Sequence, residues 1–139
     1  MKDSEFVNLE SNVGIPGPQL PYPVQKFCIV KYSPEKVYVI GGETEEGTYS
    51  YLPTPSINNV LIFNPMKNFT HIEGPAMIEK RNSHACALMS NSNQSKIIVV
   101  AGGLGDDYTN SLSSVEIFNS TLNTWIPGKT YTISNYKCL

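Results

Sequence analysis

A motif that recurs along the chain limits its folding more than any other feature of the sequence. In the best-preserved copy, Lys96 to Gly128, an apolar and β-branched run ends in Gly102-Gly103, and a polar loop follows. A second strand-like run and a turn then lead to Trp125, the only tryptophan of the chain. Another apolar run ends in Gly41-Gly42, and the same elements follow it in a weaker form. Repeats of this length predict structural units that stack on their neighbours to bury apolar faces.

Both ends of the chain carry parts of the same motif. Residues 5–17 align without gaps with residues 116–128, and six of the thirteen positions are identical. Residues 128–138 resemble residues 74–86 in the same way. We therefore expect four segments: the second half of a unit over 1–16, a degenerate whole unit over 17–73, a second whole unit over 74–127, and the start of a further unit over 128–139.

Each whole unit reads as four short strands separated by turn residues. The strands are expected over 26–32, 36–40, 58–63 and 68–72 in the first unit, and over 84–90, 96–101, 114–119 and 124–126 in the second. No window has the apolar spacing of an amphipathic helix. The apolar runs of the first two strands in each unit suit strands that are buried on both faces. The sequence thus predicts an all-β fold of antiparallel, four-stranded units.

The three cysteines fall at similar places in the repeats. Cys28 lies eleven residues after Gly17, Cys86 lies twelve after Gly74, and Cys138 occupies the corresponding part of the C-terminal segment. We interpret them as one repeat position met three times, and not as a disulfide or metal-binding set. An odd number of cysteines without a secretory signal favours reduced thiols and a cytoplasmic location.

Charge and composition exclude several classes of function. The formal net charge of −2 and the pI near 5.6 argue against nucleic acid or an anionic membrane as the partner. The longest apolar run, 97–101, is far shorter than the roughly 20 residues of a membrane span. The histidines and cysteines lack the short spacing of a zinc site, and no nucleophile motif occurs. We therefore expect no metal, no cofactor and no catalytic residue.

Two strands, a double glycine, a variable loop, an aromatic residue and then a tryptophan resemble the kelch repeat. The spacing of about 55 residues is close to the ~50 of that family. The copy with Gly102-Gly103, Phe118 and Trp125 matches best, although Phe118 stands where a tyrosine is usual. The first copy departs further, because its loop after Gly42 is long and Phe69 replaces the tryptophan. The resemblance implies that each unit is one four-stranded blade of a β-propeller.

The motif residues are expected to hold the blades together rather than to carry chemistry. Glycine permits positive φ and close approach of the chain, and buried aromatic rings fill the space between sheets. The Arg-x-x-His spacing at the start of the first strand of the second unit resembles a feature of kelch-like repeats, and we expect His84 to be structural. The residues assigned to this structural motif are Gly41, Gly42, Phe63, Phe69, Arg81, His84, Gly102, Gly103, Phe118 and Trp125.

The loops that follow the double glycines are the candidates for function. Both combine carboxylates with tyrosines, and in a propeller both should emerge on one face. Such a mixture suits a protein partner with a basic segment, while the alternative is an acidic loop that is only solvated. The candidate partner-binding residues are Glu43, Glu45, Glu46, Tyr49, Tyr51, Asp106, Asp107 and Tyr108.

The resemblance also bounds the function of the whole protein. It implies a non-enzymatic interaction module, such as the substrate-recognition part of a BTB-kelch ubiquitin-ligase adapter or an actin-binding protein. The alternative is an enzyme built on the propeller, either like the copper radical oxidases or active on carbohydrates. A propeller needs about four to eight blades, so the remaining blades are expected to lie outside this chain. Alone, its edge strands and apolar faces would make it unstable or self-associating.

Overall fold

A computed structural model describes residues 5–8, 13–17, 19–44, 54–90, 95–106 and 110–129 of the 139. Nearly all regular structure in these residues is β, in three antiparallel sheets. A hairpin of β1 (Glu5–Asn8) and β2 (Val13–Pro16) forms the smallest. The first four-stranded sheet holds β3 (Cys28–Ser33), β4 (Lys36–Ile40), β5 (Val60–Asn64) and β6 (Thr70–Glu73). The second holds β7 (Ala85–Ser90), β8 (Lys96–Ala101), β9 (Val115–Asn119) and β10 (Thr124–Pro127).

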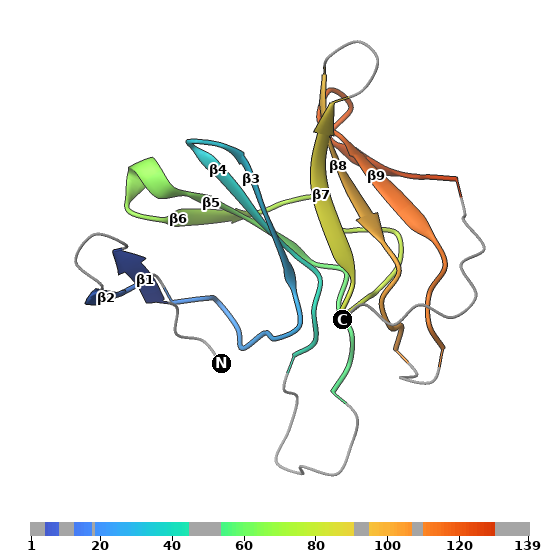
Figure 1. Ribbon diagram of the computed structural model, residues 1–139, viewed down its shortest axis with the longest axis horizontal. Helices are drawn as coiled ribbons and strands as arrows, with labels where there is room; N and C mark the ends of the chain where they lie inside the picture. Colours follow the sequence, from blue (N-terminus) through green and yellow to red (C-terminus); the bar gives the residue numbers. More distant parts are fainter. Residues whose placement is uncertain are drawn as a thin grey trace.

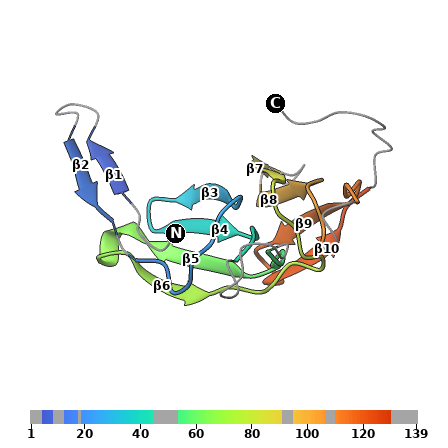
Figure 2. The same ribbon diagram turned by 90° about the horizontal axis from the view of Figure 1, so that it is seen from below.

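Both four-stranded sheets are meanders in which every strand pairs with the next one along the chain. The strands agree with the ranges expected from the sequence to within two residues at each end. Figure 2 shows the two sheets side by side, with β3 and β7 at one edge and β6 and β10 at the other. The β1–β2 hairpin lies beside the first sheet, on the side away from the second (Figure 2).

The turn between the third and fourth strands is built in the same way in both sheets. Asn64 accepts a hydrogen bond from the backbone N–H of Met66 at 2.9 Å, just before a short 3-10 helix, Pro65–Lys67. Asn119 likewise accepts from the backbone N–H groups of Thr121 and Leu122. An asparagine side chain that mimics a backbone turn explains why this residue recurs at the end of each third strand.

The main core lies between the two four-stranded sheets. Alternate residues of each strand face this core, because successive side chains of a strand point to opposite faces. Its buried members are Val30, Tyr38, Ile40 and Val60 from the first sheet, Ile98, Val100, Phe118 and Trp125 from the second, and Met77 from the connection between them. A smaller cluster on the other face of the first sheet contains Val39, Leu61 and Phe63.

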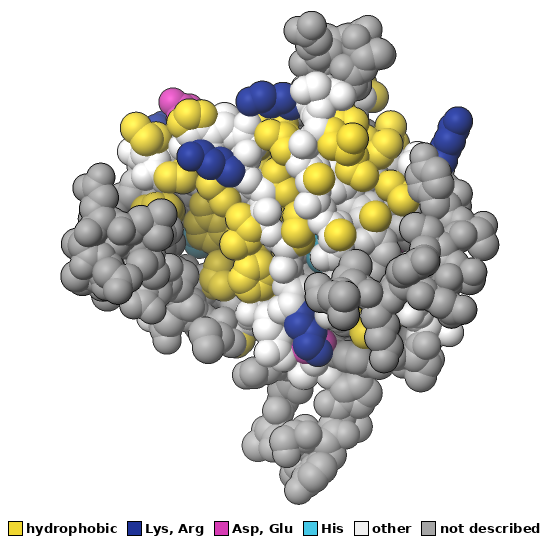
Figure 3. Space-filling model, viewed as in Figure 1, with side chains coloured by type: hydrophobic (Ala, Val, Ile, Leu, Met, Phe, Trp, Pro, Cys, Tyr) yellow, Lys and Arg dark blue, Asp and Glu magenta, His cyan; other side chains and the backbone are white. Residues whose placement is uncertain are grey.

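Burial on both faces, expected for the first two strands of each unit, holds for β4 and fails for β7. Tyr38, Val39 and Ile40 are all buried. In β7, however, Leu88 and Met89 are 37% and 51% exposed. Figure 3 shows hydrophobic side chains gathered over β3 and β7. The difference arises because both faces of β4 are covered, one by the second sheet and the other by Leu20, Tyr22 and Phe27, whereas one face of β7 points away from the first sheet.

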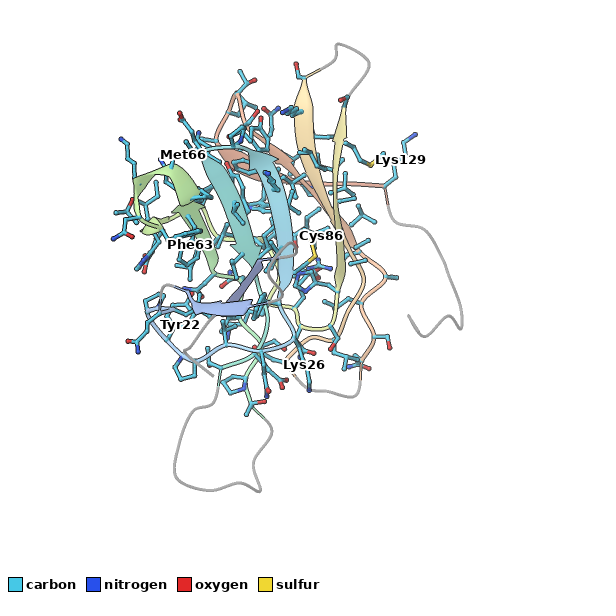
Figure 4. All side chains as sticks on the ribbon, turned by 60° about the vertical axis from the view of Figure 1, so that its left-hand side comes forward. Tyr22, Lys26, Phe63, Met66, Cys86 and Lys129 are labelled. Atoms are coloured by element: carbon cyan, nitrogen blue, oxygen red, sulfur yellow. A yellow bond between two sulfur atoms is a disulfide. The ribbon has the colours of Figure 1, made fainter. Side chains whose placement is uncertain are left out.

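The expectation that the cysteines form no disulfide is wrong for Cys28 and Cys86. The structure joins them by a disulfide bond with the two Cα atoms 6.1 Å apart (Figure 4). The register shows why the repeat alignment misled. Cys28 pairs with Ile40, directly before Gly41, whereas Ala85 pairs with Ala101, directly before Gly102. Ala85 is thus the counterpart of Cys28, and Cys86 is one residue further along, so its side chain points to the opposite face.

Candidate functional site

The connections expected to carry function leave the two sheets at the same edge. The described ends of the β4–β5 and β8–β9 connections lie at the lower edge in Figure 1, together with the segments that lead into β3 and β7. We call this the loop edge. Short bridges extend each sheet into it, joining Gln25, Glu43 and Ser56 below the first sheet and Asn82, Leu104 and Ser111 below the second.

The double glycine lets the segment before β7 approach the first sheet closely. Gly41 has a φ of +58°, and a Cβ atom there would lie 2.7 Å from the Arg81 carbonyl oxygen. Next to it, the backbone N–H of Gly42 donates to that carbonyl at 2.9 Å. A side chain at position 41 would therefore be strained and would push the two sheets apart.

Arg81 joins this segment to the second sheet through its side chain, which is fully buried. Its guanidinium donates to the Gly102 carbonyl at 2.8 Å and to the carboxylate of Glu116 at 2.8 Å. It also donates to Glu79 and Ser114. The planar fork of an arginine suits several acceptors at once. Arg81 thus contacts one sheet through its carbonyl and the other through its guanidinium.

Glu116 completes the contact and was missed as a site residue in the sequence. Only 2% of it is exposed, and its carboxylate accepts from the backbone N–H groups of Ile78 at 2.6 Å and Glu79 at 3.1 Å. The alignment of 5–17 with 116–128 held a signal, because Glu5 and Glu116 are identical there. A glutamate repeated inside an apolar strand indicates a fixed partner for its charge.

A second polar contact crosses between the sheets at the loop edge. The side-chain amide of Asn82 donates to the Ser56 hydroxyl at 2.8 Å, and Ser56 donates to the Gly105 carbonyl at 3.1 Å. Asn82 and Ser56 are both fully buried. These hydrogen bonds satisfy polar groups that would otherwise be costly to bury, so they fix the two connections relative to each other.

His84 lies between the two double glycines and is 8% exposed. Burial, and to a smaller extent the nearby charge of Arg81, lower the pKa of its imidazole to about 4, against smaller opposing effects of the Ile40 and Arg81 backbone. Neither ring nitrogen makes a hydrogen bond of good geometry with a described residue. The side chain is therefore a neutral packing group at neutral pH.

The aromatic motif residues lie in both apolar clusters, and two of them lie where the two sheets meet. Phe118 and Trp125 are 1% and 6% exposed, and their ring centroids are 5.3 Å apart. The Trp125 indole N–H donates to the Pro75 carbonyl at 2.8 Å. Phe63 is buried in the smaller cluster, against which Phe69 packs. The burial of these side chains agrees with a packing role, and that role itself stays a prediction.

Glu43 differs from the exposed loop carboxylate expected from the sequence. It is 1% exposed, accepts from the Gln25 side chain at 2.8 Å, and forms an ion pair with Lys26 at 2.8 Å. The physical reason is its bridge between two segments below the first sheet. Leu104 follows the other double glycine at the same place, and that apolar counterpart was the signal that position 43 faces inward.

A shallow hollow of about 420 Å³ opens at the loop edge of the second sheet. Its lining residues come from the β6–β7 and β8–β9 connections and are Glu79, Lys80, Gly105, Asp106, Asn110 and Leu112. Lys80 and Asp106 form an ion pair across it at 3.1 Å, with both side chains 51% exposed. Among the other candidate partner-binding residues, Glu45, Glu46, Tyr49, Tyr51, Asp107 and Tyr108 lie outside the described residues.

Within the part of the chain that the structure describes, no three His, Cys, Asp or Glu side chains are placed to hold one metal ion. Over the same residues, no helix is long and apolar enough to cross a membrane.

Comparison with known proteins identifies the repeat. The family model of the kelch motif matches residues 90–130, which contain Gly102-Gly103 and Trp125. The chain carries a kelch repeat. No curated protein matches the chain in sequence.

Solved structures support the fold of this kelch-repeat chain. A fungal alcohol oxidase of the AA5 family, in complex with copper, matches with a TM-score of 0.67 and 16% identity over 86% of this chain and 25% of its own. The protein YjhT matches with a TM-score of 0.66 and 15% identity over 86% of this chain and 41% of its own. The chain therefore spans less than half of either structure. The fold is that of a partial kelch propeller, and we call the sheets β3–β6 and β7–β10 its first and second blade.

Proposed function

We propose that the kelch blades form a protein-interaction module whose loop edge binds a partner through a basic segment. The observation that carries the proposal is the hollow between the β6–β7 and β8–β9 connections. Connections held by a rigid sheet scaffold are where binding surfaces most often occur. The buried contacts of Arg81, Glu116, Ser56 and Asn82 provide that rigidity directly behind the hollow.

The charges at the hollow favour a basic ligand. Glu79 and Asp106 line it together with a single cation, Lys80, and Glu79 is already hydrogen-bonded to Arg81. Since Lys80 and Asp106 are both half exposed, their ion pair contributes little and can be exchanged for a partner's arginine or lysine. Asp107 and Tyr108 follow directly in sequence and would add a further carboxylate and an aromatic ring.

The loops after the double glycines are proposed to set the choice of partner. Glu45, Glu46, Tyr49 and Tyr51 in the β4–β5 connection repeat the mixture of acids and tyrosines in the β8–β9 connection. In this proposal the chain supplies the recognition surface of a cytoplasmic adapter, such as one that recruits substrates to a ubiquitin ligase, or of an actin-binding protein. An enzyme on the same scaffold remains the alternative, since one similar structure is an oxidase.

Charge reversal at the hollow tests the proposal. We expect Asp106→Lys in the full-length protein to weaken capture of its partner by at least about tenfold, or ~1.4 kcal/mol, because a cation would then face the basic segment. Quantitative pull-down followed by mass spectrometry measures this. Reversal of Glu45, Glu46 and Asp107 in addition should abolish capture.

Glu35→Lys is the matched control. It makes the same change of charge at an exposed position in the turn between β3 and β4, at the opposite edge of the first blade. It should leave capture unchanged. If the Asp106 and Glu35 variants capture the same partners as the wild type, the loop edge is only solvated and the proposal is wrong.

A further inference from the structure

The disulfide joins the two blades at a place where backbone hydrogen bonds do not. β3 and β7 are edge strands of separate sheets, so their contact depends on side chains. Besides the Cys28–Cys86 bond, the Lys96 ammonium in β8 donates to the Tyr32 carbonyl in β3 at 3.0 Å. Among the described residues, few other bonds therefore hold β3 to the second blade if the disulfide opens.

The positions of the two cysteines are specific to this pair of blades. Cys28 in β3 faces the second blade, and Cys86 faces the first because it lies one residue past the counterpart of Cys28. The first-blade residue that corresponds to Cys86 is Ile29, which is 57% exposed. Two cysteines at one repeat position would point the same way around the ring and could not face each other. The offset of one residue is what brings these two together.

We infer that the disulfide of Cys28 and Cys86 is a redox-responsive clip between β3 and β7, the first strands of the two blades. Both residues are only partly buried, so a small thiol can reach the bond. A glutathione thiolate attacks one sulfur, the S–S bond breaks, and the other cysteine leaves as a thiolate. A second glutathione then resolves the mixed disulfide, giving glutathione disulfide and two cysteine thiols, with two electrons and two protons gained by the protein.

The clip is placed to affect the loop edge. Cys28 follows Lys26, whose carbonyl accepts from the backbone N–H of Ser83 and whose ammonium pairs with Glu43. Cys86 follows His84, which packs against the double glycines of both blades. Reduction removes the covalent link between β3 and β7 directly beside these contacts. The two blades can then separate, starting at these two strands.

The test equilibrates the purified 139-residue chain in oxidised or reduced glutathione. Free thiols are alkylated, the protein is digested, and cross-linked peptides are identified by mass spectrometry. We expect a Cys28–Cys86 cross-link in oxidised glutathione only. We also expect reduction to lower the thermal unfolding midpoint by about 10 °C, because the bond closes a long loop, and reoxidation to restore it.

Variants separate the clip from general effects of reductant. Cys28→Ser and Cys86→Ser should each unfold like the reduced wild type in either buffer, while Cys138→Ser should keep the full wild-type response. The reduced wild type needs no substitution, so the comparison stands even if a serine variant folds poorly. Free Cys28 and Cys86 in oxidised protein, a cross-link to Cys138 instead, or an unfolding midpoint that ignores reduction would overturn the inference.

Discussion

His84 shows how a single buried side chain can make the stability of the blades depend on pH. Its pKa is about 4 in the folded chain, chiefly because burial disfavours the charged form, against about 6.5 in an unfolded chain. Between these values the unfolded chain binds more protons than the folded one. The stabilisation is therefore complete above pH 6.5 and is lost as the pH falls toward 4.

We expect the wild type to lose up to about 3 kcal/mol of unfolding free energy through His84 between pH 6.5 and pH 4. Urea denaturation across this range, followed by Trp125 fluorescence, measures the loss. His84→Phe is the comparison, because Phe27 occupies the corresponding position before β3. The variant should show a shallower dependence on pH. Equal slopes in the two proteins would mean that His84 is not buried in its neutral form.

Single residues were the hardest features to predict from the sequence. The double glycines and Trp125 could be found because they recur or stand alone in composition. Glu43 was misjudged because a charge next to a loop looks solvent-exposed, and only its bridge to Gln25 and Ser56 shows otherwise. The disulfide was missed because an alignment gap of one residue reverses the direction in which Cys86 points.

At the scale of elements, the connection between β6 and β7 holds the two blades together. The counterparts of Arg81 and Glu116 in the first blade are Val24 and Leu61, which are 3% and 2% exposed. The same two positions thus hold a charged pair in one blade and apolar side chains in the other. This comparison indicates that the fold requires burial at both positions, and that either charge requires its partner.

Arg81→Ala is expected to destabilise the chain by about 3–5 kcal/mol, because it leaves the Glu116 carboxylate buried without its counter-charge. The double variant Arg81→Val, Glu116→Leu should lose less unfolding free energy than Arg81→Val alone and Glu116→Leu alone lose together, by at least about 1 kcal/mol. Urea unfolding midpoints of the four proteins give this coupling energy. Lys80→Ala, at a half-exposed neighbour, is the control and should cost under about 1 kcal/mol. Additive single effects would contradict the account.

Strands were predictable because their pattern is local. The apolar runs and the turn residues between them placed all eight blade strands to within two residues. What the pattern could not supply is which face of each strand meets a neighbouring sheet. The burial of β4 on both faces and the exposure of Met89 in β7 depend on the packing of whole sheets.

At the scale of the whole molecule, the two faces of the chain are unequal. The outer face of the first blade is covered in part by Leu20, Tyr22 and Phe27, which pack on its buried cluster. On the face of the second blade that points away from the first, Met89 and Ile126 are 51% and 39% exposed. Apolar side chains on a sheet face are where a further blade would pack in a propeller, and they promote association when uncovered.

Sedimentation velocity of the 139-residue chain over a range of concentrations tests most directly whether its two sheets are blades of an incomplete propeller. We predict self-association that grows with concentration and that Met89→Lys with Ile126→Lys reduces. Ile72→Lys, at a 66% exposed position on β6, should not reduce it. A wild-type chain that stays a sharp monomer at all concentrations would contradict this account.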